Sequence, residues 1–135
     1  MLTYLSIGSN LGDKEDNINN AVSLLDKTVG AVCRRSSFYY SEPWGFNSEN
    51  NFVNIVVAVD TELSPIDLLH ATQNIERMLG RAEKTTDNVY TDRIIDIDII
   101  LYGNLHIDMP ELKIPHPLMH LRNFVMVPLA EIQEK

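Results

Sequence analysis

Apolar and polar positions along the chain form short strand-like runs separated by two segments with helical spacing. Residues 2–8 are mostly apolar and precede a Gly-Ser-Asn turn, a pattern that predicts a short buried strand. Residues 31–40 and 52–61 are rich in β-branched and aromatic side chains, which favour strands. Residues 94–102 predict a fourth strand, which ends before Gly103-Asn104.

Two helices are predicted from their start signals and their apolar spacing. Asp13 can cap a helix from Lys14 to Thr28, and Ser64 followed by Pro65 is a strong start for a second helix that ends near Gly80. The apolar face of the first helix comprises Ile18, Ala21, Val22, Leu25 and Val29. The buried face of the second is expected to comprise Leu68, Leu69, Thr72, Ile75, Met78 and Leu79.

The element order β-α-β-β-α-β predicts an α+β, ferredoxin-like antiparallel sheet in one domain, residues 1–135. Both helices should cover one face, and loops and the chain's tail, or a ligand, should occupy the other. Residues 41–51 and 81–92 are expected to be loops, the second long enough to act as a catalytic lid. Pro115 and Pro117 bound a turn near Met119, and residues 128–134 predict a terminal helix.

Composition narrows the classes of protein to consider. The 135 residues are 44% apolar, carry a net charge of −8 and include one cysteine. No apolar run approaches the roughly 20 residues of a membrane span, and the start lacks the features of a secretory signal. We therefore expect a cytoplasmic monomer with no nucleic-acid or membrane partner, because an acidic chain repels polyanions.

Asp96 and Asp98 are the most informative pair in the sequence. Side chains alternate along a strand, so Ile95, Ile97, Ile99 and Leu101 should point one way and Ile94, Asp96, Asp98 and Ile100 the other. Two neighbouring carboxylates flanked by isoleucine are costly unless a cation lies between them. Mg²⁺ suits such oxygen ligands. The alternative is a strand whose second face is simply exposed to solvent.

Basic residues gather next to this strand, at Arg77, Arg81, Lys84 and Arg93. Cations on a loop that faces a metal pair suit phosphoryl transfer, because they neutralise charge that develops in the transition state. The acidic residues interleaved with them support the alternative of a solvated loop, with Arg81 stabilising the end of the helix.

An aromatic residue and an amide, Phe52 and Asn54, share one face of the third strand, and Trp44 lies in the preceding loop. Such a pair could stack on a flat heterocycle and recognise its edge, although a core phenylalanine and a strand-end asparagine are the simpler alternative. His116 stands between two prolines and is followed by Arg122 and Phe124, and this histidine could equally be structural.

Five motifs follow one another along the chain: Ile7–Gly12, Gly80-Arg81, Asp92–Gly103, Pro115-His116-Pro117 and Arg122-Asn123-Phe124. Together they resemble the 6-hydroxymethyl-7,8-dihydropterin pyrophosphokinase family over nearly the whole chain. The resemblance implies an ATP-dependent pyrophosphokinase of folate biosynthesis. Such an enzyme moves pyrophosphate from ATP, its co-substrate, to the hydroxymethyl group of a reduced pterin and leaves AMP.

The resemblance also assigns roles, residue by residue. Asp96 and Asp98 would bind two Mg²⁺ ions, and Asp98 would help to activate the pterin hydroxyl. Arg81 and Arg93 would stabilise the transferring group. Phe52 and Phe124 would sandwich the pterin, whose edge would meet Asn54 and backbone groups of Ser41 and Trp44. The ATP contacts would be Gln73, Glu76, Lys84, Tyr90, Ile99, His116 and Arg122.

The chain departs from the family pattern in several ways, and two of these departures fall on predicted site residues. Tyr90-Thr91-Asp92 stands where many members have Trp-Gly-Pro, and Phe52 stands where tyrosine is frequent. Two other functions remain open from the residues alone: a non-catalytic ligand-binding module on the same fold, and a Mg²⁺-dependent phosphohydrolase that uses the same aspartates.

Overall fold

The computed structural model of the chain describes residues 1–41, 51–80 and 94–133. Its elements are β1 (Leu2–Ser9), α1 (Lys14–Thr28), β2 (Gly30–Arg35), β3 (Tyr39–Ser41), β4 (Phe52–Thr61), α2 (Pro65–Met78), β5 (Asp96–Tyr102), β6 (Ile107–Met109), β7 (Leu112–Ile114), a short 3₁₀ helix (Met119–Leu121) and α3 (Asn123–Ile132). In this described part, no helix is long and apolar enough to cross a membrane.

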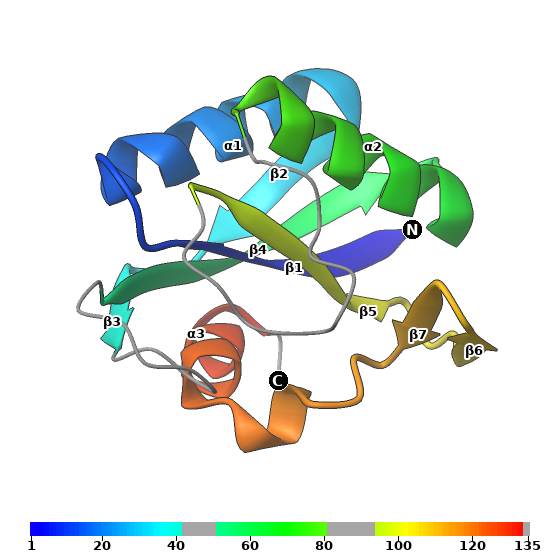
Figure 1. Ribbon diagram of the computed structural model, residues 1–135. Helices are drawn as coiled ribbons and strands as arrows, with labels where there is room; N and C mark the ends of the chain where they lie inside the picture. The colour runs from blue at the N-terminus through cyan, green and yellow to red at the C-terminus, as the bar shows by residue number, and fades with distance from the viewer. Residues whose placement is uncertain (42–50, 81–93, 134–135) are drawn as a thin grey trace.

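The main sheet is antiparallel and has the strand order β2-β4-β1-β5, with β3 paired to β4. Figure 1 shows α1 and α2 on one face of this sheet and α3 on the other. The strands and helices of the predicted β-α-β-β-α-β order are all present, so the ferredoxin-like prediction is confirmed.

The two predicted helix starts are confirmed at the level of single hydrogen bonds. The Asp13 carboxylate accepts from the backbone N–H of Asp16 at 3.3 Å, and the Ser64 hydroxyl accepts from the N–H of Asp67 at 3.2 Å. Pro65 occupies the first turn of α2, where its missing N–H costs nothing. Both helices therefore begin at the residues predicted from the local sequence.

Three details of the predicted elements are wrong. Residues 31–40 are two strands, because the Ser36 hydroxyl accepts the N–H of Val56 and interrupts the regular ladder. Met78 is 59% exposed rather than buried, and Glu76 takes a place on the buried face of α2. Leu101 does not share a face with Ile99, because the pairing of β1 with β5 shifts register between Tyr4 and Leu5.

The C-terminal segment also differs from its prediction. The predicted terminal helix begins at Asn123, and Pro128 lies inside it. Its buried side chains are Val125, Pro128, Leu129 and Ile132. A proline inside a helix costs about 3 kcal/mol of stability. The free energy gained by burying this apolar stripe against the sheet exceeds that cost. The hairpin of β6 and β7 was not predicted.

The second face of the sheet has an apolar end and a polar end. Tyr4, Val56, Ala58 and Ile100 pack against α3 at the apolar end. Further along the same three strands, β1 contributes Ser6 and Gly8, β4 contributes Asn54, and β5 contributes Asp98 and Asp96. The register pairs Gly8 with both Asn54 and Asp96, and Ser6 with Asp98. Helix α3 thus covers the apolar end of this face, and the other end is polar.

Candidate active site

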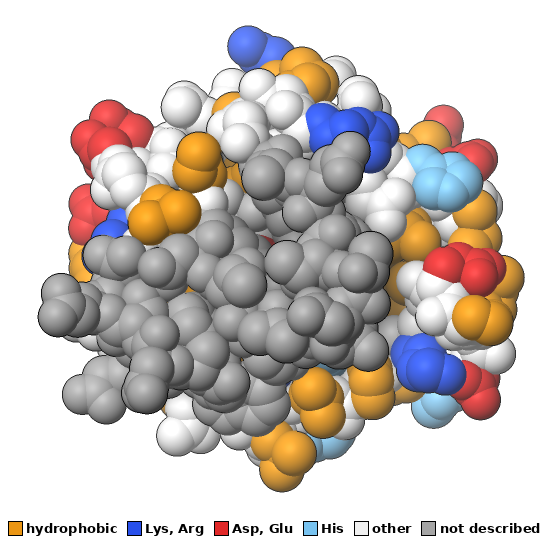
Figure 2. Space-filling view, viewed as in Figure 1, with side chains coloured by type: hydrophobic (Ala, Val, Ile, Leu, Met, Phe, Trp, Pro, Cys, Tyr) orange, Lys and Arg blue, Asp and Glu red, His pale blue; other side chains and the backbone are white. Residues whose placement is uncertain are grey.

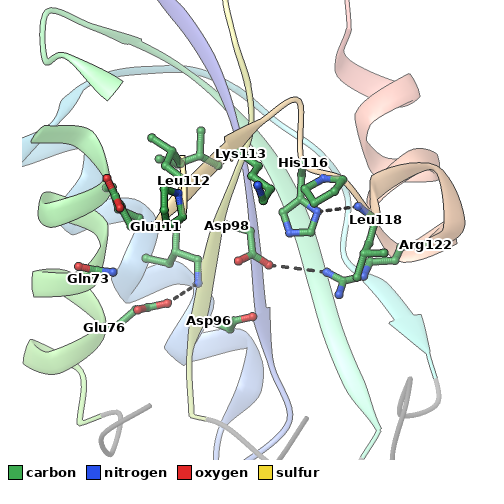
Figure 3. A pocket seen from close by; sticks show the side chains of 15 residues that line it. Gln73, Glu76, Asp96, Asp98, Glu111, Leu112, Lys113, His116, Leu118 and Arg122 are labelled. Carbon is green, nitrogen blue, oxygen red and sulfur yellow. Dashed lines mark hydrogen bonds and ion pairs between the residues drawn. The ribbon is translucent and has the colours of Figure 1, made fainter. Parts of the chain in front are cut away.

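Asp96 and Asp98 lie on β5, the edge strand of the sheet. Both are half-buried, whereas Ile97 and Ile99 between and beyond them are buried in the core on the helix side. The predicted alternation is therefore confirmed at these positions, and the two carboxylates share the face that carries α3. Figure 3 shows them in the centre of a pocket.

The pocket has a volume of about 420 Å³ and follows the free edge of β5. In Figure 3, α2 borders it on one side and the segment of His116 and Arg122 on the other. It brings together residues that are up to 53 positions apart, with Leu69 and Arg122 at the extremes. The predicted metal and ATP residues among its lining are Gln73, Glu76, Asp96, Asp98, Ile99, His116 and Arg122.

Glu76 connects α2 to β5 between the two aspartates. Its carboxylate Oε2 accepts the backbone N–H of Ile97 at 2.7 Å, and the side chain is only 4% exposed. An N–H on the outer side of an edge strand has no strand to pair with, so this carboxylate completes the hydrogen bonding of β5. The bond fixes the backbone from which Asp96 and Asp98 project.

Replacing Glu76 with alanine is expected to lower the free energy of unfolding by about 2 kcal/mol, because a buried N–H loses its charged acceptor. Denaturant unfolding measures this loss, and hydrogen exchange should become faster at the amide of Ile97. Gln73→Ala, one turn earlier on the same helix and half-buried, is the control. Equal losses in the two variants would contradict the role of the Glu76 bond.

Arg122 supplies a buried positive charge beside Asp98. Its guanidinium nitrogen Nη1 lies 3.9 Å from the Asp98 carboxylate, and the residue is 4% exposed. The same guanidinium lies over the ring of Phe124, 5.5 Å from its centroid, a cation–π geometry. Arg122 therefore links a predicted metal ligand to a predicted pterin-stacking residue.

His116 is held beside β5 by its own backbone, whose N–H donates to the carbonyl of Ile100 at 3.0 Å. Its Nδ1 accepts from the N–H of Leu118 at 3.2 Å, so the proton of the neutral ring lies on Nε2. Burial, and then the charge of Arg122, lower the pKa of His116 to about 4, against a weaker opposing effect of Asp96. His116 is therefore a neutral hydrogen-bond donor near pH 7.

The imidazole of His116 should accordingly titrate with a midpoint near 4 rather than the ordinary 6.5. Because its folded-state pKa is lowered, the stability that the neutral ring contributes is complete above pH 6.5 and is lost as the pH falls toward 4. Long-range ¹H–¹⁵N spectra of the imidazole measure both the midpoint and the tautomer. A midpoint near 6.5 would contradict the assignment.

The hairpin of β6 and β7 forms a wall of the pocket that the sequence interpretation missed. The unpredicted lining residues are Leu69, Ile97, Pro110, Glu111, Leu112, Lys113, Pro117 and Leu118. The only signal for the hairpin was a short apolar–polar–apolar alternation on each side of Pro110-Glu111. Figure 2 shows acidic, basic and histidine side chains together over this end of the molecule. Lys113 pairs there with Asp108 and lowers its pKa.

The predicted pterin residues that the structure describes lie on neighbouring strands and on α3, and they are not among the lining of that pocket. Ser41 of β3 pairs directly with Phe52 of β4, and Asn54 follows two positions later on the same face. Ser41 Oγ and Asn54 Nδ2 are buried and have no hydrogen-bond partner among the described residues. Buried polar atoms are normally satisfied, so these two indicate a place for a polar ligand.

Trp44, Arg81, Lys84, Tyr90 and Arg93 lie outside the described residues, as do the loop of residues 42–50 and the whole of the predicted lid. Their assignments remain predictions from the sequence. Among the residues that are described, no three His, Cys, Asp or Glu side chains form a metal-binding group. Two aspartates alone suit Mg²⁺, which keeps several water or phosphate ligands.

Comparison with known proteins identifies relatives of this chain. The family model described as 7,8-dihydro-6-hydroxymethylpterin-pyrophosphokinase (HPPK) matches residues 4–134. A 2-amino-4-hydroxy-6-hydroxymethyldihydropteridine pyrophosphokinase of Porphyromonas gingivalis is 48% identical over 97% of this chain and 90% of its own length. A protein of the same name from Bacillus subtilis is 39% identical over 97% of this chain and 77% of its own length.

Solved structures support the fold. A crystal structure described as HPPK-DHPS in complex with substrates superposes with a TM-score of 0.79 at 14% identity. A Plasmodium falciparum HPPK-DHPS structure superposes with a TM-score of 0.72, also at 14% identity. The chain spans about 40% of the length of each of these proteins. The match over residues 4–134 and the identity to shorter relatives establish that the chain belongs to the 7,8-dihydro-6-hydroxymethylpterin-pyrophosphokinase family.

Proposed function

We propose that this chain transfers the pyrophosphoryl group of ATP to the hydroxymethyl group of 6-hydroxymethyl-7,8-dihydropterin, in folate biosynthesis, with AMP as the other product. Family membership supports the reaction. The observation that carries the proposed site is one pocket around Asp96 and Asp98, because it unites residues from α2, β5 and the 116–122 segment that the resemblance assigned to ATP and metal.

The metal site comprises Asp96 and Asp98, which hold two Mg²⁺ ions. The donor set fits, because both carboxylates are half-buried oxygen ligands on one face and leave positions for phosphate and water. The bound ions would neutralise and polarise the phosphate oxygens of ATP. Arg122 holds Asp98 in place from the opposite side of the pocket.

The ATP site extends from the aspartates along the edge of β5. His116 donates a hydrogen bond from Nε2, and Arg122 adds a positive charge that attracts the phosphates. Glu76 holds the backbone of β5 at Ile97, and Ile99 and Gln73 complete the wall. Lys84 and Tyr90 belong to this site by resemblance.

The pterin site lies at the polar end of β4. The buried Asn54 Nδ2 and Ser41 Oγ form hydrogen bonds with the edge of the pterin ring. The resemblance assigns Trp44 to the same edge. Phe52 and Phe124 stack on the two faces of the ring. Burying the ring between aromatic side chains excludes water, which would otherwise compete with the pterin hydroxyl for the phosphate.

In the chemical step, the hydroxymethyl oxygen attacks the β-phosphorus of ATP as its proton leaves. The bond from the β-phosphorus to the oxygen that it shares with the α-phosphorus breaks, and AMP departs with the electron pair. Asp98 helps to accept the hydroxyl proton, and Arg81 and Arg93 neutralise the charge on the pyrophosphoryl group during its transfer. No covalent intermediate with the protein forms.

The function is tested by incubating the purified chain with ATP, Mg²⁺ and hydroxymethyldihydropterin and separating the nucleotides. AMP and the pterin diphosphate should form in equal amounts, and neither should form when the pterin is omitted. Release of phosphate or pyrophosphate without pterin would instead identify a phosphohydrolase. Binding of both ligands without turnover would identify a non-catalytic module.

We further propose that the protein works in the cytoplasm, as a monomer and as one domain over residues 1–135. The exposed free Cys33 and the absence of any second cysteine suit a reducing compartment. Sedimentation of the purified chain measures its oligomeric state.

A further inference from the structure

We infer that Gly8 is a positioning residue for the pterin: it provides the space in which the recognition amide of Asn54 lies. This inference rests on the proposed function, because it assumes that Asn54 binds the edge of the ring. Gly8 is in β1, and its cross-strand partner in the sheet is Asn54 of β4.

The Asn54 amide occupies the place where a side chain at position 8 would begin. A Cβ added to Gly8 would lie 2.3 Å from Asn54 Oδ1, 3.3 Å from Cγ and 3.8 Å from Nδ2. These three atoms are its nearest neighbours, so the overlap is with this one side chain and with no backbone atom. Any other residue at position 8 would push the amide away by roughly 1 Å or more.

The backbone of Gly8 gives no other reason for glycine. Among the described glycines, those with positive φ are Gly12, Gly80 and Gly103, and Gly8 is part of a regular strand. Glycine weakens a strand interior, and it is found where a ligand or another group approaches the backbone closely. Here the group that approaches is the amide of a buried residue whose Nδ2 lacks a partner in the described part of the chain.

The position of Gly8 also joins the two substrate sites. Its second cross-strand partner is Asp96 of β5, so one row across the sheet reads Asn54, Gly8, Asp96. Directly paired residues point to the same face, and neighbouring strands lie about 4.8 Å apart. The Asn54 amide, which would bind the pterin, and the Asp96 carboxylate, which would bind the metal, therefore lie on either side of Gly8. The hydroxymethyl group of the pterin would meet the β-phosphate of ATP at this position.

The test is the affinity for hydroxymethyldihydropterin, measured by calorimetry with Mg²⁺ and an ATP analogue whose α- and β-phosphates are joined by methylene. Gly8→Ala should raise the pterin Kd by about 10- to 100-fold, because a displacement of about 1 Å misaligns the amide. The Kd of the ATP analogue alone should change less than about twofold, since Asp96 is not among the nearest neighbours of the added Cβ.

A double-mutant cycle separates positioning from a merely structural effect. In an Asn54→Ala background the overlap is gone, so adding Gly8→Ala should cost little further pterin affinity. Independent, multiplying losses would overturn the inference, as would wild-type pterin affinity in Gly8→Ala.

Gly30→Ala is the matched control. A Cβ there would lie 2.1 Å from the backbone oxygen of Asp60, at the far end of β4. It should lower the melting temperature and leave the pterin Kd of the folded protein unchanged. Failure of the wild-type chain to bind the pterin at all would contradict the proposed function itself, a result distinct from equal binding by wild type and Gly8→Ala.

Discussion

Asp98→Asn is expected to reduce kcat by about a thousandfold or more, because it removes one of the two carboxylates that hold Mg²⁺ on the phosphates and the group that accepts the pterin proton. The substitution keeps the shape of the side chain. Asp98 is half-buried, and its ion pair with Arg122 spans 3.9 Å, so the fold should survive. Turnover is measured as AMP formed with saturating Mg²⁺ and both substrates.

Asp60→Asn is the matched control, since Asp60 is an exposed aspartate at the far end of the same sheet. Its kcat should equal that of the wild type. The circular dichroism spectrum and melting temperature of Asp98→Asn establish that the variant is folded. A folded Asp98→Asn with near wild-type turnover would show that the metal assignment is wrong.

Asn54→Ala should weaken pterin binding by about 30- to 150-fold, the loss expected when a buried polar ligand edge is left without its partner. Asn54 is 4% exposed and its Nδ2 is unsatisfied within the described chain, so this nitrogen can donate to a ligand. ATP affinity should be unchanged, because Asn54 does not line the pocket around Asp98.

The comparison variant is Asn20→Ala, an exposed amide on α1. It should bind the pterin as tightly as the wild type does. A large loss of stability in Asn54→Ala, with pterin affinity retained, would mean that this asparagine stabilises the sheet and does not bind the substrate.

Signals carried by a few adjacent residues predicted their structure well. Asp13 and Ser64-Pro65 start helices in the chain as they would in isolated peptides, because a cap acts on the N–H groups two or three residues away. The aspartates of β5 share a face because alternation is a property of the strand itself.

Features that depend on packing between distant segments could not be predicted in this way. The bulge that turns Leu101 away from Ile99 arises from the register with β1, and α3 tolerates Pro128 because the sheet accepts its apolar stripe. Glu76 is a polar residue on a buried helix face, which periodicity alone assigns to solvent; its acceptor role requires the edge of β5.

The site shows the same division. The aspartate pair stood out from the residues themselves, whereas Gln73, His116 and Arg122 were assigned through the resemblance to a family and are brought together by the fold. Gly8 carried no chemical signal, because its contribution is the absence of a side chain beside Asn54.

The most direct test of the account is a crystal structure with Mg²⁺, the α,β-methylene analogue of ATP and hydroxymethyldihydropterin. Carboxylate oxygens of Asp96 and Asp98 should lie at about 2.1 Å from Mg²⁺, with the metal also bound to phosphate oxygens. The ring should lie against Asn54. Phosphates bound elsewhere, with both aspartates facing bulk solvent and no metal between them, would contradict it.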